Sequence, residues 1–364
     1  MQRVAQGLHA ALRRRPEVTL SSVVLRTSWS KTHLRVPVFM ARLLWDIPRR
    51  VERAGIEVVL FSSLVTAAAA PFLKRRLSRH RVCLVAVVHG RDATLPVRPY
   101  QWVVPRVLGA LDGVLAVSEA TGRACMARGL HASKLHVVGN GVDPVASSSE
   151  DRATARAALL ARLAASGCAV PGDGFLVFSA GRHVARKGFR WFASEVVPRL
   201  TPDVHYVLAG EGPETAAIRA TITQAHLAGR VHLLGKVTDT DLARLYHGSD
   251  LFVMPNLAVP GDLEGFGLVV AEAALAGLPV VAAEVDGIAE VLRITEGGTL
   301  VPSADAHAFV AAIEGYREGA FRRKVGDRAA ECARERLTWP HVVTRYLKAM
   351  EEIRDGRRVP AFAV

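Results

Sequence analysis

The sequence is poor in cysteine and has no pair of cysteines at metal-binding spacing. Its 364 residues include four cysteines, at positions 83, 125, 168 and 332, without a CxxC pair or a histidine at ligand spacing. This pattern argues against a disulfide framework and a structural zinc site, and it is typical of free thiols in a reducing compartment. We therefore expect a cytoplasmic protein.

Long apolar runs are also missing. The N-terminal stretch MQRVAQGLHAALRRR lacks the apolar segment of a secretion signal. The nearest approach to a membrane span, residues 58–73, is 16 residues long and contains two serines, a threonine and a proline. A spanning helix needs roughly 18 or more apolar residues, so we expect any membrane association to be peripheral.

Acidic residues are scarce in the first part of the chain. Residues 1–143 hold 22 Lys and Arg against 8 Asp and Glu, a net charge of +14, whereas the remainder holds 25 against 26, a net of −1. The overall charge of +13 therefore belongs to the first part alone. Such an excess favours an anionic partner, but no recognition helix or aromatic-basic interleaving supports nucleic acid.

A basic cluster lies between positions 74 and 81. We expect it to face an anionic membrane or an acidic acceptor, and the alternative is a solvated basic helix face. The cluster consists of Lys74, Arg75, Arg76, Arg79 and Arg81.

Short runs rich in Val, Leu and Ile alternate with amphipathic stretches along the chain. This alternation is typical of parallel strands covered by helices, so the predicted fold class is α/β. The length favours two domains, with the polar stretch 145–152 as linker and a last helix near 342–355. The predicted strands are 18–25, 58–61, 82–88, 114–117 and 135–138, then 175–180, 204–209, 231–234, 251–253 and 280–282.

The segment from Glu264 to Glu272, EGFGLVVAE, is the strongest candidate for a ligand-binding site. A helix that starts near Gly267 and ends at Gly277 would present free N–H groups beside side-chain-free glycines, which suits a bound anion. The two carboxylates could then accept hydrogen bonds from the hydroxyls of a nucleotide-sugar. The alternative is that acidic residues near a helix N-terminus only favour its dipole.

Three other segments could carry chemistry. GRHVARKG at 181–188 follows a strand and places cations between glycines, which suits a diphosphate; a solvated basic turn is the alternative. HGRD at 89–92 ends another strand and offers a histidine, which could equally be structural. NGVD at 140–143 is first of all a turn signal.

The DxD sequence at 239–241 predicts a helix cap rather than a metal site. Thr238 stands three residues before Asp241 and ahead of a helical pattern, as in a capping box. We expect no metal here.

The second half resembles the retaining GT-B glycosyltransferases of family 4, also called glycosyl transferases group 1. The matching segments occur in the family's order: SAGRHVARKG at 179–188, LAGEGPE at 208–214, residues 231–256, EGFGLVVAEAALAGLPVVA at 264–282 and DGIAEV at 286–291. The first half matches more weakly through VVHGRD, VLAVSEATGRACMARGL and KLHVVGNGVDP.

The resemblance implies two Rossmann-like domains whose parallel sheets face each other across a cleft. Residues 1–148 would bind the acceptor, residues 149–338 would bind the nucleotide-sugar donor, and the helix in 339–364 would pack back on the first domain. It further implies that a hexosyl unit passes from a UDP- or GDP-linked sugar to a lipid, polysaccharide or small-molecule acceptor. Neither a cofactor nor a metal is expected.

The resemblance also assigns residues. Arg182 and Lys187 would neutralise the donor diphosphate, Glu272 would hold the ribose, and Glu264 would bind the transferred sugar. His89 would approach the reaction centre. The remaining donor-side residues are Gly181, Gly212, Lys236, Val237, Gly265, Phe266, Gly267 and Leu268, and those on the acceptor side are Arg91, Asp92, Ser118 and Asn140.

The sequence departs from the family at its start. Family members open with a strand and a glycine-rich loop ahead of a helix, whereas this chain starts at Met1 within the segment that resembles that helix. Either the start of this sequence is truncated or misassigned, or the protein functions without that strand and loop. In both cases a nucleotide-sugar-binding pseudoenzyme is the alternative to a transferase.

Overall fold

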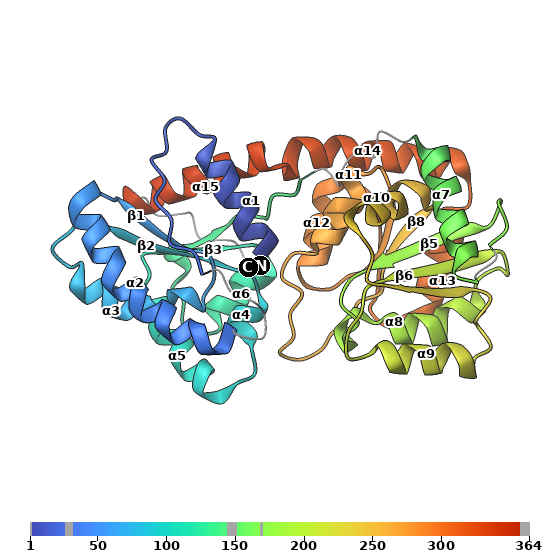
Figure 1. Ribbon diagram of the computed structural model, residues 1–364, viewed down its shortest axis with the longest axis horizontal. Coiled ribbons are helices and arrows are strands. Elements are labelled where there is room, and N and C mark those ends of the chain that lie inside the picture. Colours follow the sequence, from blue (N-terminus) through green and yellow to red (C-terminus); the bar gives the residue numbers. More distant parts are fainter. Residues whose placement is uncertain (1, 26–31, 144–150, 168–169, 357–364) are drawn as a thin grey trace. The chain divides into compact units, whose positions relative to one another are not determined.

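The computed structural model describes residues 2–25, 32–143, 151–167 and 170–356 (Figure 1). The chain divides into two compact units. The first comprises residues 1–141, 261–265 and 339–364, and the second comprises residues 142–260 and 266–338. Most of the predicted linker, residues 145–150, lies outside the described residues, while Asp151 caps the first helix of the second unit.

A four-stranded parallel sheet in the order β1-β2-β3-β4 forms the centre of the first unit. Its strands are β1 (Val58–Phe61), β2 (Cys83–Val88), β3 (Gly113–Ala116) and β4 (Leu135–Val137). Val58 pairs with Cys83, Val85 with Gly113, and Val114 with Leu135. The apolar runs are nearly continuous because helices cover both faces of the sheet.

Two helical layers sandwich this sheet (Figure 1). Leu84, Ala86 and Val88 of β2 share a core with α2 (Thr32–Ala54), η2 (Thr66–Ala69), α3 (Ala70–Arg76) and α5 (Arg98–Ala110). Alternate residues of β2 point the other way, where α15 (Trp339–Arg354) contacts β2 and β3 and is itself packed on α1 (Gln2–Arg13). The unit also contains α4 (Arg91–Thr94), α6 (Glu119–Met126) and η3 (Ala132–Lys134).

The second unit has a six-stranded parallel sheet in the order β10-β9-β8-β5-β6-β7. Its strands are β5 (Phe175–Ala180), β6 (Val204–Ala209), β7 (Val231–Gly235), β8 (Leu251–Met254), β9 (Val280–Ala283) and β10 (Gly298–Val301). The strand order reverses beside β5, because β5 pairs with both β6 and β8. Ligands of open α/β sheets bind at the carboxyl ends of strands near such a reversal.

Helices cover both faces of this second sheet as well (Figure 1). Aromatic contacts show both layers: Phe192 packs on Tyr206 and Phe309 on one face, and Tyr246 packs on Phe178 and Phe252 on the other. The helical segments are α7 (Arg152–Ala165), η4 (Ala185–Lys187), α8 (Phe189–Trp191), η5 (Phe192–Val196), η6 (Val197–Arg199), α9 (Thr215–Gln224), α10 (Asp239–Gly248), α11 (Leu268–Leu275), α12 (Asp286–Thr295), α13 (Ala306–Gly315) and α14 (Gly319–Leu337).

One predicted strand is wrong, and one strand of the structure was not predicted. Residues 18–25 form no strand, and Leu20 and Val24 are exposed, because no neighbouring strand pairs with this segment. The sequence pattern also missed β10. A Cβ on Gly298 would lie 1.8 Å from the carbonyl oxygen of Val280, so the close pairing of β10 with β9 needs a residue that is rare in strands.

No helix among the described residues is long and apolar enough to cross a membrane. Cys83, Cys125 and Cys332 are free thiols, as predicted, and Cys168 lies outside the described residues.

Candidate functional site

The loops after β5, β6 and β7 lie against one another at the carboxyl edge of the second sheet. Gly181 N donates to Ala209 O (3.0 Å), and Gly210 N donates to Gly235 O (2.8 Å). A Cβ on Gly210 would lie 1.9 Å from the carbonyl oxygen of Gly181, and its φ of +128° also requires glycine. This packing gathers the loops that hold Gly181, Gly212 and Lys236.

Two cations of the 181–188 loop differ in their surroundings. Lys187 is buried at the end of η4, and its Cε would lie 3.6 Å from a Cβ placed on Gly181. Its side chain therefore lies beside the carboxyl end of β5. Arg182 is exposed. The loop thus offers one fixed cation and one that can adjust to a bound anion.

The buried His183 links the loops after β5 and β6, and the sequence did not predict this link. His183 Nδ1 lies 2.9 Å from Thr215 Oγ1, and the same hydroxyl accepts a hydrogen bond from Gly212 N. Burial lowers the pKa of His183, so its ring is neutral at neutral pH. A Cβ on Gly212 would lie 2.3 Å from His183 O. His183 therefore fixes the shape of the loop between Arg182 and Lys187.

The glutamate segment forms the helix start that the sequence predicts. Gly267 is the N-cap of α11 in the left-handed conformation (φ +76°), and no side chain caps the helix. Its first-turn N–H groups are those of Leu268 and the residues after it, at the edge of the sheet where β8 ends. Phe266, just before the cap, is buried.

Glu272 lies in the second turn of α11 and is 7% exposed. The Tyr246 hydroxyl, from α10, donates to Glu272 Oε2 at 2.9 Å. Sequence reasoning assigned Tyr246 only to the apolar side of its helix and missed this contact. A buried carboxylate is costly unless it is hydrogen-bonded, so Tyr246 helps to hold Glu272 in its place and rotamer.

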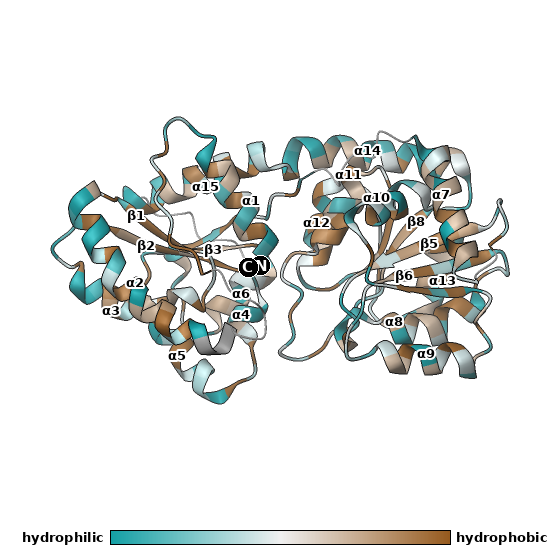
Figure 2. Ribbon diagram, viewed as in Figure 1, coloured by the Kyte–Doolittle hydropathy of each residue, from teal (hydrophilic) through white to brown (hydrophobic). Residues whose placement is uncertain are grey.

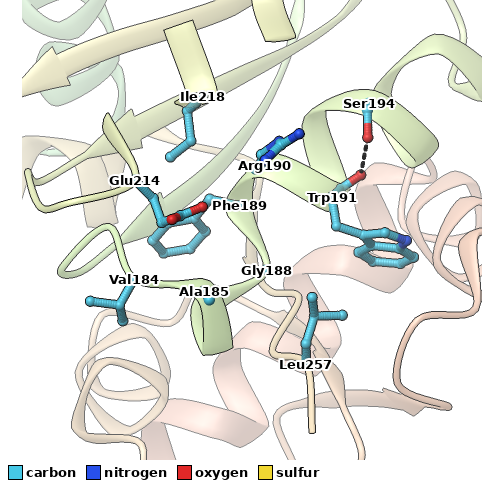
Figure 3. A pocket seen from close by; sticks show the side chains of 10 residues that line it. All are labelled: Val184, Ala185, Gly188, Phe189, Arg190, Trp191, Ser194, Glu214, Ile218 and Leu257. Atoms are coloured by element: carbon cyan, nitrogen blue, oxygen red, sulfur yellow. Dashed lines mark hydrogen bonds between the residues drawn. The ribbon is translucent and has the colours of Figure 1, made fainter. Parts of the chain in front are cut away.

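A pocket of about 330 Å³ lies behind the same loop, between η4, α8 and α9 (Figure 3). Figure 3 shows Glu214 and Val184 on one side of the pocket and Trp191 on the other. The pocket is bordered by Val184 and Ala185 of the loop. None of the predicted donor residues lines it, although Val184, Ala185 and Gly188 belong to the 181–188 loop.

The structure confirms the capping interpretation of the DxD sequence. The Thr238 hydroxyl accepts a hydrogen bond from Asp241 N (3.1 Å) at the start of α10. The Asp241 carboxylate is bound by Thr238 Oγ1 (2.9 Å) and by Arg162 Nη1 (2.8 Å). Among the described residues, no group of three or more His, Cys, Asp or Glu is placed to hold a metal ion.

His89 directly follows β2 in the first unit and is held from two sides. Its Nε2 lies 3.0 Å from the carbonyl oxygen of Ser62, and its backbone N donates to Asp92 Oδ1 at 2.8 Å. Burial lowers the pKa of His89 despite the opposing effect of Asp92. The imidazole is therefore neutral near pH 7 and donates from Nε2 to Ser62.

Residues 261–265 belong to the first unit and pack on the His89 turn. A Cβ on Gly265 would lie 2.0 Å from His89 O, and a Cβ on Gly90 would lie 2.5 Å from Leu263 Cδ2. Arg91 Nε lies 3.6 Å from Asp262 Oδ1. The structure thus brings His89 and the half-buried Glu264 segment together, although 175 residues separate positions 89 and 264.

The other residues predicted on the acceptor side differ in their availability to a ligand. Both carboxylate oxygens of the buried Asp92 accept backbone hydrogen bonds, from His89 N and Leu64 N. Ser118 is the buried N-cap of α6 and accepts from Thr121 N (3.0 Å). Asn140 is 3% exposed, and its Oδ1 has no hydrogen-bond partner within the described part of the chain.

Two family models match the chain over most of its length. The model described as "Glycosyltransferase Family 4" matches residues 5–145, and "Glycosyl transferases group 1" matches residues 174–317. The chain belongs to the family 4 glycosyltransferases. In this family 4 chain, the candidate residues around His89 lie in the first match and those around Lys187 and Glu272 lie in the second.

Curated relatives of this family 4 chain carry several names. A D-inositol 3-phosphate glycosyltransferase of Mycolicibacterium gilvum (strain PYR-GCK) is 33% identical over 58% of this chain and 45% of its own length. The Amylovoran biosynthesis glycosyltransferase AmsK of Erwinia amylovora is 25% identical over 65% and 55%. A Phosphatidyl-myo-inositol mannosyltransferase of Mycolicibacterium smegmatis is 31% identical over 50% and 46%. The chain therefore spans about half the length of these relatives.

Solved structures show that this family 4 chain has the GT-B fold. Anabaena Alr3699/HepE in complex with UDP superposes with a TM-score of 0.71 at 20% identity, over 89% of this chain and 84% of that one. Sucrose-phosphate synthase from Thermosynechococcus elongatus gives 0.70 at 18% identity, over 98% and 92%.

Proposed function

We propose that this protein transfers a hexosyl unit from a nucleoside-diphosphate sugar to an acceptor hydroxyl, with retention at the anomeric carbon. The observation that carries the proposal is the buried Lys187 beside the carboxyl end of β5, in a loop fixed by His183 and Thr215. The named glycosyltransferase relatives and the UDP bound by the Anabaena protein support it.

The donor is proposed to lie along the edge of the second sheet. The diphosphate would contact Arg182, Lys187 and the first-turn N–H groups of α11, since cations and a helix N-terminus both favour phosphate. Glu272 would accept hydrogen bonds from the ribose hydroxyls. The base, uracil or guanine, would lie against Lys236 and Val237 after β7.

The proposed chemistry needs no carboxylate nucleophile. The bond between the anomeric carbon and the diphosphate oxygen breaks, the acceptor hydroxyl oxygen bonds to the same face of that carbon, and its proton passes to the departing phosphate oxygen. Negative charge grows on the diphosphate as this happens. Lys187, Arg182 and the α11 N-terminus would stabilise that charge, so we propose a reaction independent of divalent metal.

The first unit is proposed to supply the acceptor side. Glu264 and the backbone at Gly265 would contact the transferred sugar, and His89 beside them would approach the reaction centre. The neutral His89 ring is held to Ser62 O, so it would position the sugar as a hydrogen-bonding group and not as a fixed cation. A lipid, polysaccharide or small-molecule hydroxyl would enter here.

We also propose that the protein attaches peripherally to an anionic membrane from the cytoplasmic side. The support is the charge of +14 confined to residues 1–143. The free thiols of the described cysteines are typical of a reducing compartment.

A donor screen followed by a turnover assay tests the transferase proposal. UDP- and GDP-sugars should stabilise the protein against heat, since a ligand at 100 times its Kd adds about 2.7 kcal/mol. Lys187→Met and Arg182→Ala should lower kcat/KM about ten- to a hundredfold, because each removes a charge-assisted contact to the leaving group. Arg190→Met, on the pocket side of the same segment, is the matched control. Donor binding without release of nucleotide in the presence of any acceptor would instead favour a pseudoenzyme.

A further inference from the structure

Large exposed hydrophobic side chains gather on three helices of the first unit. Trp45 of α2 is 59% exposed, Phe72 of α3 is 66% exposed, and Trp102 of α5 is 72% exposed. Val38 of α2 and Val103 of α5 are exposed as well. Aromatic side chains this open to water mark an interaction surface when they lie together.

These helices form one continuous layer on the sheet. α3 packs against both α2 and α5, and the inward sides of all three enter the same core through Leu43, Leu73 and Val104. Figure 1 shows these helices on one side of the sheet. Because the aromatic side chains are exposed to solvent, they lie on the side of that layer that faces away from the sheet. Figure 2 shows hydrophobic and hydrophilic stretches alternating along it. We call this surface the α2-α3-α5 face.

The α2-α3-α5 face is strongly basic. Its three helices hold ten Lys and Arg against two acidic residues, a net charge of +8. The cations lie next to the aromatic residues: the Arg49 guanidinium lies 3.2 Å from the Trp45 ring centroid, and Arg106 Nη1 donates to Trp102 O at 2.7 Å. Lys74, Arg75 and Arg76 follow Phe72 within the same short helix.

The opposite layer of the same sheet provides an internal comparison. Its helices, α1 and α15, hold five Lys and Arg against two acidic residues, a net charge of +3. None of the large exposed hydrophobic side chains of the described chain lies on either helix. General solubility needs no combination of exposed aromatics and cations, so the difference between the layers indicates a specific partner for one of them.

We propose that the α2-α3-α5 face docks on a bilayer surface rich in anionic phospholipids. Trp45, Phe72 and Trp102 would enter the interfacial region, where amphipathic aromatic rings are favoured, and the surrounding Arg and Lys would contact lipid phosphates. The positive charge complements an anionic surface. The inference rests on the proposed peripheral attachment and deepens it by assigning the face.

Co-sedimentation of the full chain with vesicles tests the assignment. The wild-type protein should bind vesicles of phosphatidylcholine with 30% phosphatidylglycerol, should bind pure phosphatidylcholine at least tenfold less, and should release as salt rises. The variant W45A/F72A/W102A should lose at least tenfold in affinity for the anionic vesicles. V259A/F321A, which removes exposed hydrophobic residues of the second unit, should bind as wild type.

The outcomes distinguish three claims: that the α2-α3-α5 face docks on the bilayer, that the protein attaches to membranes at all, and that it binds a donor sugar. Equal vesicle binding by W45A/F72A/W102A and wild type would overturn the face while peripheral attachment stands. Absence of binding by the wild type, or binding that ignores lipid charge, would overturn both. Thermal stabilisation by donor sugars, measured on the same variants, reports the proposed donor site independently and also shows that the triple variant is folded.

Discussion

The Tyr246 hydroxyl of α10 donates a hydrogen bond to Glu272 Oε2 of α11 at 2.9 Å. Tyr246 is itself buried, and its ring packs edge-on against Phe178 of β5 at 5.3 Å between centroids. The carboxylate proposed to bind the ribose is therefore fixed by a side chain that belongs to the core of the second unit. This contact therefore links the proposed ribose-binding carboxylate to the packing of α10 on the sheet.

Tyr246→Phe should weaken donor binding about two- to tenfold while turnover at saturating donor changes little. The substitution removes one hydrogen bond of about 0.5–1.5 kcal/mol and leaves the ring in place. Isothermal titration with the nucleotide found in the donor screen measures the change. Tyr316→Phe is the matched control, since it removes a similar contact to Thr299 Oγ1 (3.0 Å) in the same unit. Equal losses in both variants would show a general effect on folding.

Gly210→Ala should lower stability and donor affinity together. The added Cβ would lie 1.9 Å from Gly181 O and would also have to adopt a φ of +128°, so the loops after β5 and β6 would separate. Gly229→Ala, where no atom lies within 4 Å of the new Cβ, should be neutral. Thermal unfolding with and without donor measures both effects. Retention of full donor affinity in Gly210→Ala would contradict the proposed role of this loop contact.

Removal of divalent metal should leave the activity unchanged. Asp241 is bound by Thr238 and Arg162, and so its carboxylate is already used within the protein. Turnover in excess EDTA should equal turnover with added Mg²⁺ or Mn²⁺. Thr238→Ala should cost about 1 kcal/mol of stability through loss of the cap, at any metal concentration. Activity that disappears in EDTA and returns with Mg²⁺ would refute this.

The stability of the second unit should fall in mild acid because of two stacked histidines. His205 Nδ1 lies 3.2 Å from His232 Nε2, and both rings are buried. Burial, with a smaller contribution from His205, lowers the pKa of His232 from its ordinary 6.5 to about 4. Between these two pH values the unfolded chain binds more protons than the folded one, so stability is complete above pH 6.5 and declines toward pH 4.

The decline attributable to His232 should reach roughly 3 kcal/mol. Urea unfolding at pH 7 and at pH 4.5 measures it, and His232→Gln should show a shallower loss than wild type. His80→Gln, at an exposed position, should behave as wild type. The same pH dependence in all three proteins would rule out the histidine pair as its source.

Most of the sheet architecture was predictable, since buried parallel strands leave continuous apolar runs such as Phe175–Ala180. The two errors, the strand predicted at residues 18–25 and the missed strand β10, both concern the pairing of strands. Residues 18–25 have the composition of a strand but no neighbour, whereas Gly298–Val301 has a neighbour but little strand character. The local sequence shows whether a segment favours the strand conformation. It does not show whether another strand, elsewhere in the chain, is placed to pair with it.

The residues proposed to bind the donor were easier to predict from the sequence than the residues that hold them in place. Lys187 stands out because a cation beside glycine is conspicuous in a sequence, and Glu272 stands out because it closes the EGFGLVVAE segment. Tyr246 and His183 do not, because one looks like a core aromatic residue and the other like part of a basic turn. Their roles depend on contacts with Glu272, 26 residues away, and Thr215, 32 residues away, which only the folded arrangement of α10, α11 and the β5 loop creates.

The first unit is assembled from three stretches of chain, 1–141, 261–265 and 339–364. Trp339 lies so close to Gly7 and Gly141 that a Cβ on either glycine would approach its ring to 2.4 Å. A fragment ending near residue 148 would lack this tryptophan and expose the side of α1 that bears Val4 and Leu8. A single crossover between relatives would likewise combine stretches of different origin in this unit, so an exchange of the first unit must carry all three stretches together.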